Sequence, residues 1–278
     1  MLVYDGRAFG VQECKLNLRE LFPTVDERRD FHNRFENFLK SDPSNRIIFA
    51  LKGELLAYSS EVFVSDRIDN RPPLLLLLGN PASHSVAEGM CFAYEKEGQE
   101  HRFWRLLDET GVLTFLDLPP ISSDLKKNIE TRRNSLLELN YHSPFRIGIA
   151  VFYSLPSSAS DKEWQGVNGI KKLLGANAFQ KISLQEEARI SLLISRFFGS
   201  RGGIITFQKD AYEGMRSQDT PAYDQQLARQ GKLVGNYRKG QHILLAGAPP
   251  TREAYWFSSK KTMQKYKILL TEHCIPKV

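Results

Sequence analysis

Cysteine is scarce in this sequence, and the three cysteines present lie far apart. Cys14, Cys91 and Cys274 form no Cys-x-x-Cys pair. Neither a zinc cage nor a four-cysteine iron–sulfur cluster can therefore be built from cysteine within one chain. So small and odd a count is also typical of a reducing compartment. We expect no metal, no iron–sulfur cluster and no other cofactor.

The sequence also lacks any long apolar run. Its first ten residues, MLVYDGRAFG, hold no basic segment followed by an apolar core. No stretch approaches the ~18 consecutive apolar residues that a membrane-spanning helix needs. We therefore expect an intracellular protein with no membrane partner.

No linker, internal repeat or low-complexity tract divides the 278 residues. Hydrophobic residues at 41% and charged residues at 25% are globular proportions, and the length is ample for an independent core. We expect a monomer whose residues 1–278 form one α/β domain with an N-terminal helical extension over about residues 1–45. There Phe31, Phe35, Phe38 and Leu39 recur at helical spacing, which predicts a helix from near Thr24.

Five consecutive leucines, Leu74 to Leu78, are the most informative stretch of the chain. A short, bounded apolar run predicts a strand buried on both faces, as in the interior of a parallel sheet. We expect the strand to start at Leu74, because the preceding Pro-Pro pair cannot sit in a central strand. Gly79 permits backbone angles closed to other residues, and Pro81 is expected to fix the next turn, so that Asn80 lies on a rigid corner. Open α/β sheets place their sites at such carboxyl ends.

Three further apolar runs repeat the order of strand, loop and helix. They are FRIGIAVF (145–152), GGIITF (202–207) and HILLAG (242–247). Parallel strands need crossover helices, which cover both faces of the sheet. The pattern predicts a three-layer α/β/α sandwich around a central, mostly four-stranded parallel sheet. We expect residues 157–160 to form an exposed loop and the polar interval 216–240 to be an insertion.

The residues after the leucine strand carry a resemblance to a known family. They are, in chain order, Asn80, Pro81, Ser85, Gly89, Phe92, Ala93, Arg102, Phe103 and Trp104. This series resembles the first motif of the uracil-DNA glycosylase superfamily, and most closely its mismatch-specific uracil/thymine branch, with no gap between Asn80 and Phe92. The segment 208–213, QKDAYE, is similar to the family's third strand–helix junction, with Gln208 in place of the usual glycine.

The resemblance implies a DNA glycosylase of base excision repair, a hydrolase that flips a uracil-like or deaminated base out of DNA and cleaves its N-glycosidic bond. Asn80 would be the catalytic residue: its amide can orient a water but is no base. The base pocket would be formed by Gly79, Pro81, Ala82, Ser85 and Phe92. DNA is then the expected partner, in the cytoplasm or wherever the DNA is. Lysine and arginine exceed aspartate and glutamate by 38 to 32, a net charge of +6, which suits a polyanion without demanding one.

The family's last motif departs most from its pattern in this chain. After the fourth strand, family members have His-Pro-Ser or Asn-Pro-Ser, whose first residue donates to the base. The positions that the resemblance assigns to DNA binding here are Ala248, Pro249, Pro250, Thr251 and Arg252. Ala248 stands where the donor is expected, which puts efficient uracil excision in doubt. The aromatic residues at 255–257 are either core or a wedge that fills the vacated stack.

Two other function classes remain open at this point. A catalytically weak or inert DNA-binding member of the same fold would keep the basic surface and the pocket but release no base. An unrelated small-molecule hydrolase would use Cys91 with His84 or His101. The apolar neighbours of Cys91, Met90 and Phe92, favour a buried and inert thiol instead.

Overall fold

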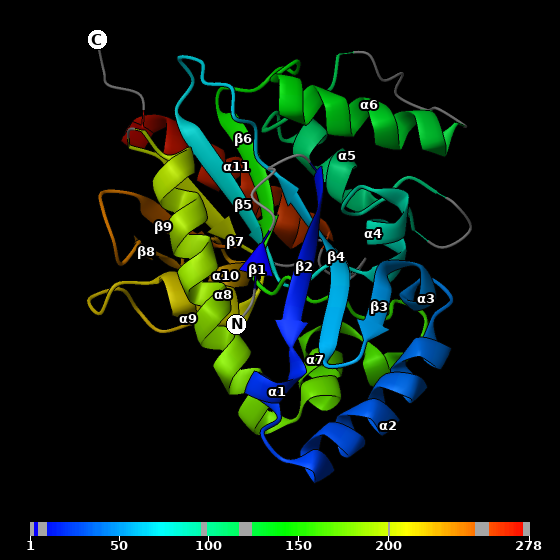
Figure 1. Cartoon of the computed structure of the whole chain (residues 1–278). Helices are drawn as coiled ribbons and strands as arrows, with labels where there is room; N and C mark the ends of the chain where they lie inside the picture. Colours follow the sequence, from blue (N-terminus) through cyan, green and yellow to red (C-terminus); the bar gives the residue numbers. More distant parts are fainter. Residues whose placement is uncertain are drawn as a thin grey trace.

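A mixed sheet runs through the molecule, with helices packed on both of its faces (Figure 1). The computed structural model describes residues 3–4, 10–95, 99–116, 124–199, 201–247 and 256–274. The strands are β1 (Val3–Tyr4), β2 (Gly10–Asn17), β3 (Phe49–Lys52), β4 (Leu55–Phe63), β5 (Pro73–Leu78), β6 (Arg146–Val151), β7 (Gly203–Thr206), β8 (Val234–Asn236) and β9 (Ile243–Ala246). The helices are α1 (Leu18–Leu21), α2 (Val25–Ser41), α3 (Asn45–Ile48), α4 (Ser83–Glu88), α5 (Arg102–Glu109), α6 (Leu125–Glu138), η2 (Lys162–Trp164), α7 (Gly166–Leu174), α8 (Ala176–Phe197), α9 (Lys209–Met215), α10 (Gln225–Arg229) and α11 (Trp256–Cys274).

Four parallel strands form the centre of the sheet, as the sequence predicts. Across the described residues the strand order is β1-β2-β4-β6-β5-β7-β9-β8, with β3 paired to β4. Strands β6, β5, β7 and β9 are parallel, and antiparallel strands flank them. The leucine strand β5 lies between β6 and β7 with all six residues buried. It begins at Pro73, one residue before the predicted start, because the first position of a strand tolerates a residue without an N–H.

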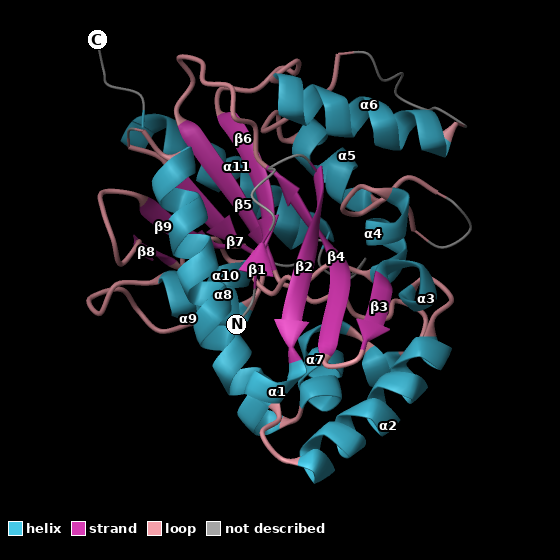
Figure 2. Ribbon diagram, viewed as in Figure 1, coloured by secondary structure: helices cyan, strands magenta, loops and turns pink. Residues whose placement is uncertain are grey.

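The leucines of β5 alternate between the two faces of the sheet. Leu75 and Leu77 belong to one core, to which α2, α7, α8 and α9 contribute buried side chains. Leu74, Leu76 and Leu78 belong to a second core with α5, α6 and α11. Figure 2 shows the helical layers with the sheet between them. The architecture is therefore the three-layer α/β/α sandwich that the sequence predicts.

The carboxyl end of β5 is a topological switch point. From β5 the chain runs along α5 and α6, on one face of the sheet, to reach β6. From β6 it runs along α7 and α8, on the opposite face, and reaches β7 on the other side of β5. Ligands of open α/β sheets bind outside the carboxyl ends of the strands at such a point. The residues that follow Leu78 are therefore in the position where a site is expected.

The N-terminal region contains the predicted helix but is only partly helical. Thr24 caps α2 in a capping box with Glu27, and Phe31, Phe35 and Phe38 are buried, which confirms the helix and its start. Residues 10–17, however, form β2, which pairs with β4 along its whole length. The expected helical extension over residues 1–45 is wrong for this segment. Its side chains alternate between buried and partly exposed, a weak period-two pattern that pairing with β4 stabilises.

The interval 216–240 also joins the sheet. It contains α10 and β8, and β8 pairs antiparallel with β9 at the edge.

The longest helix, α8, is amphipathic: Ile182, Ile190 and Ile194 are buried while Lys181 and Arg196 are exposed. In the part of the chain that the structure describes, no helix combines the length and the apolar character that crossing a membrane requires.

Candidate active site

Gly79 ends the leucine strand and allows a close approach to the start of α9. A Cβ built on Gly79 would lie 3.0 Å from Cγ of Gln208, the residue that caps α9 through Ala211 N–H. Gly79 is not among the described glycines with positive φ. Gly79 therefore does not use the positive φ angles that glycine permits. A side chain at this corner would press on Gln208, which would have to shift by a few tenths of an ångström where β5 meets the α9 cap.

Asn80 follows at the predicted carboxyl end of the central parallel strand. Its Nδ2 donates to the carbonyl oxygen of Pro81 at 3.0 Å and to Oγ of Ser157 at 2.8 Å. A carbonyl oxygen can only accept, so the NH2 end of the amide must face Pro81 and Oδ1 must face the other way. Among the described residues, Oδ1 has no hydrogen-bond donor. The free polar atom of this side chain is therefore an acceptor.

Ser157 joins the Asn80 corner to the loop after β6. Its N–H donates to Pro81 O at 3.0 Å, and its carbonyl accepts from Ser83 N–H at 2.9 Å. Its Oγ also accepts from Gly166 N–H at 2.9 Å. Ser157 and Ser158 are 3% and 1% exposed, so the expectation of an exposed loop is wrong for both. The polarity of the segment pointed to exposure, but donors inside the protein satisfy both hydroxyls: the Asn80 amide and Gly166 N–H for Ser157, and Asp161 N–H for Ser158.

Helix α4 holds the turn that carries Phe92. The helix starts after Ala82, and its buried Ser85 accepts through its carbonyl from Met90 N–H at 3.1 Å. Gly89 ends α4 with a φ of 80°, and Phe92 itself has a φ of 50°. Left-handed backbone at a phenylalanine is costly and persists only where neighbouring contacts enforce it. One such contact is the bond from Trp104 Nε1 to Phe92 O at 2.9 Å.

The Phe92 ring lies in an aromatic cluster. Its centroid is 4.4 Å from the rings of both His101 and Phe103. His84 and Tyr94 form a neighbouring pair with centroids 5.0 Å apart. The ring of Phe92 is only partly buried, so one part of it stays available to a ligand. That Phe92 faces Asn80 across one pocket stays a prediction.

The imidazoles of this cluster are neutral at pH 7. Burial lowers the pKa of His84 below its usual range. Burial also lowers the pKa of His101 to about 4, although the nearby Glu95 carboxylate opposes the shift. The Glu95 carboxylate accepts from Arg102 Nε at 2.6 Å and from its terminal nitrogen at 2.8 Å, and these bonds lower the pKa of Glu95 to about 2. The cluster therefore places no net charge beside Phe92.

No family model and no curated protein matches the chain. The resemblance to the glycosylases stays a prediction. Any inference about function therefore rests on the contacts at the Asn80 corner.

Cys91 is unsuited to nucleophilic catalysis. It is 2% exposed, and burial, together with the neighbouring Glu61 carboxyl, raises its pKa well above the usual range. The thiolate is the nucleophilic form, and it is therefore strongly disfavoured at neutral pH. Within the described residues, no group of three or more His, Cys, Asp or Glu side chains is placed to hold a metal ion.

The five positions assigned to DNA binding, from Ala248 to Arg252, lie outside the described residues. The segment leaves the sheet at Gly247, whose N–H donates to Thr206 O at 2.8 Å, so it starts at the same carboxyl edge as Asn80. On its far side, Trp256 begins α11 with the Arg105 guanidinium 4.5 Å from its ring centroid. Phe257 is 85% exposed, so it is not a core residue.

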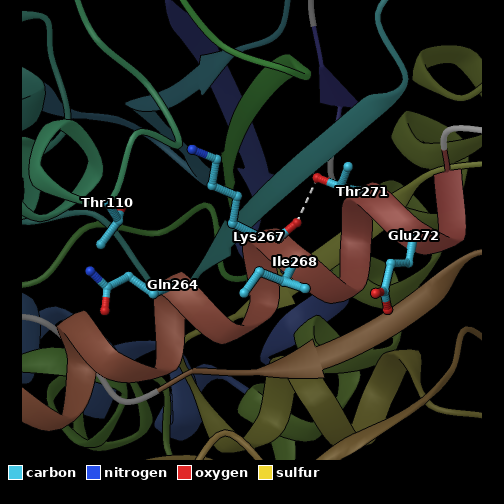
Figure 3. Close-up of a pocket in the computed structure, with 6 residues that line it drawn as sticks. All are labelled: Thr110, Gln264, Lys267, Ile268, Thr271 and Glu272. Atoms are coloured by element: carbon cyan, nitrogen blue, oxygen red, sulfur yellow. Dashed lines mark hydrogen bonds between the residues drawn. The ribbon is translucent and has the colours of Figure 1, made fainter.

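Two hollows were not foreseen from the sequence. One, of about 520 Å³, lies on the α7–α8–α9 face beyond the ends of β6 and β7. On its wall Tyr153 donates through its hydroxyl to Asp210 at 3.3 Å, and Tyr153 N–H donates to Gly79 O at 2.8 Å, so this wall backs the corner. The other, of about 490 Å³, lies between Thr110 and the outer face of α11 (Figure 3). It borders the later turns of α11 around Ile268, away from the corner.

Proposed function

We propose that the chain is a DNA glycosylase that flips a uracil-like or deaminated base out of DNA and hydrolyses its N-glycosidic bond. The observation that carries this proposal is the Asn80 amide, fixed at the carboxyl end of β5 with Oδ1 free to accept. An acceptor of this kind orients a water by accepting a hydrogen bond from it, which turns a lone pair of the water toward the sugar. The amide does not deprotonate the water, so catalysis rests on positioning.

Backbone N–H groups at the same corner suit the leaving base. The base departs with negative charge, which fixed donors in a dry site stabilise strongly. Within the described part of the chain, the N–H groups of Asn80 and Ala82 have no acceptor. Pro81, between them, has no N–H. One free N–H donor therefore lies on each side of Pro81, where it can meet an oxygen of the departing base.

Phe92 supports the proposal as the stacking surface for the flipped base. Its partly exposed ring is held by the His101 and Phe103 contacts, and its backbone is fixed by Trp104. A preformed aromatic face lowers the cost of ordering the pocket when the base enters. Both neighbouring imidazoles are neutral, so neither adds a positive charge that would bind a base without regard to its identity.

DNA as the partner is supported by charge at the same edge. The net charge of the chain is +6. Lys209, the first residue of α9, and Lys261, in α11, are both exposed, and both helices begin beyond the carboxyl ends of parallel strands. Phosphates are favoured near helix N-termini and near lysine.

An inert DNA-binding protein of the same fold is the second candidate. The observation in its favour is Ala248, which stands where the resemblance places the donor to the base. Such a protein would bind the same DNA with the same salt dependence and leave every base attached.

The deciding experiment measures binding and base release on the same duplexes. Labelled oligonucleotides would carry one uracil, hypoxanthine, xanthine or mismatched thymine, with an undamaged duplex as control. Abasic sites are cleaved with alkali and resolved on a gel, and binding is followed by fluorescence anisotropy. The glycosylase proposal expects release from at least one lesion. Binding without release from any of the four supports the inert binder, and neither binding nor release refutes both.

A further inference from the structure

We infer that Ser157 is the positioning residue of this site, because it holds the Asn80 amide with its oxygen directed outward. The role of Ser157 in catalysis rests on the proposed function, whereas its geometry rests on the observed contacts alone. Ser157 is distant from Asn80 in sequence, and its partners among the described residues are groups of the corner and of α7, so it acts on the reaction through Asn80.

The Asn80 amide is fixed by two acceptors of different kinds. Pro81 O, at 3.0 Å, belongs to the next residue and decides which end of the amide is NH2. A single hydrogen bond leaves the amide free to rotate about it. The second bond, to Ser157 Oγ at 2.8 Å, fixes the plane of the amide and with it the direction of Oδ1.

In its hydrogen bond with Asn80, the Ser157 hydroxyl is the acceptor. A serine oxygen has two acceptor lone pairs, and Asn80 Nδ2 and Gly166 N–H, at 2.9 Å, occupy both. The N–H of Gly166 belongs to the start of α7, so the helix fixes the position of the oxygen. The backbone bonds from Ser157 N–H to Pro81 O and from Ser83 N–H to Ser157 O fix the residue itself. Asn80 is therefore oriented by an acceptor that cannot move independently of the corner.

Ser157→Ala is the test, with Ser158→Ala as the matched control. Ser158 is the next residue and is also buried, but its hydroxyl contacts Asp42 and Asp161 N–H instead of Asn80. Ser157→Ala is expected to slow single-turnover base release about 10- to 100-fold with unchanged DNA affinity, because misplacement of a reacting group by ~1 Å costs about 10²-fold. Ser158→Ala should stay within about threefold of wild type. Equal rates for Ser157→Ala and wild type would overturn the inference.

A double-mutant cycle separates positioning from a general structural effect. If Ser157 acts only through Asn80, Ser157→Ala has no further effect on base release in an Asn80→Ala background. A further loss of about tenfold in that background would show that Ser157 acts by another route.

Hydrogen exchange of the Asn80 side-chain amide tests the geometry without any substrate. The NMR signal is assigned by its loss in Asn80→Ala. Ser157→Ala is expected to speed exchange of one Nδ2 hydrogen at least tenfold, and Ser158→Ala to leave it unchanged. Unchanged exchange in Ser157→Ala overturns the inference whatever the activity. Faster exchange in a protein that releases no base supports the positioning role and refutes the proposed function.

Discussion

Replacing Asn80 with alanine removes two hydrogen bonds at the corner of the sheet. Both acceptors keep a second donor, because Pro81 O still accepts from Ser157 N–H and Ser157 Oγ from Gly166 N–H. No buried polar atom is left without a partner, so the free energy of unfolding should fall by only ~1–2 kcal/mol, about 1 kcal/mol per bond. Asn80→Ala should therefore fold, which thermal unfolding followed by circular dichroism would check.

Base release should be far more sensitive to this change than folding or DNA binding. Oδ1 is the polar atom of Asn80 that remains free for a water, and loss of one positioned group in a dry site typically costs ~3 kcal/mol in the transition state. This corresponds to a fall in rate of about a hundredfold or more. DNA affinity should stay nearly unchanged, because the amide acts on a water instead of on the duplex.

Single-turnover kinetics on the best lesion duplex would measure the rate, and anisotropy on the same duplex would measure affinity. The reasoning predicts a slow variant that binds as wild type does. An Asn80→Ala variant as fast as wild type would show that Asn80 is not the catalytic residue. A loss of affinity as large as the loss of rate would place Asn80 in contact with DNA and refute its role on water.

Four further outcomes are expected. Phe92→Ala should weaken both binding and base release, because stacking is worth ~1–3 kcal/mol per base; an effect on rate alone would exclude stacking. Binding should weaken steeply with salt, and Lys209→Gln or Lys261→Gln should each reduce the slope of log affinity against log salt by about 0.9; a flat salt dependence would contradict the electrostatic surface. Phe257→Ser should reduce base release from a paired duplex more than from a single strand if the exposed ring fills the vacated stack; an equal effect on both would contradict that role. Burial raises the pKa of Glu61 to about 8, so the native state keeps a proton that the unfolded chain loses. The free energy of unfolding should therefore fall between about pH 4.5 and pH 8, by at most ~1.4 kcal/mol per pH unit. Chemical denaturation at several pH values should show a smaller fall for Glu61→Gln, and an identical fall would exclude Glu61 as its source.

The parts of the fold that sequence patterns predicted correctly depend on local chemistry. The leucine run is recognisable without its partners, because a short, bounded apolar run is typical of a strand whose two faces are both covered, as in a parallel sheet. Helix α2 was predictable for a similar reason, since its apolar stripe and the Thr24 cap lie within a few turns of one another. The parallel centre of the sheet follows from the order of strands and helices along the chain.

The parts that were predicted wrongly depend on partners distant in sequence. Strand β2 has only a weak alternation of its own and becomes a strand by pairing with β4. Gly79 lies at the predicted corner, but the neighbour that a side chain there would press on is Gln208, on another strand–helix junction.

The sequence by itself determined the layer architecture, the buried strand and the position of Asn80 at its end, because each is encoded in the periodicity or turn chemistry of one short segment. Only the tertiary structure decided the direction in which Oδ1 of Asn80 points. That orientation depends on Ser157, which the parallel pairing of β5 and β6 brings beside Asn80 and which the start of α7 fixes through Gly166. The polarity of a serine predicts exposure, whereas donors contributed by other loops can satisfy its oxygen and bury it.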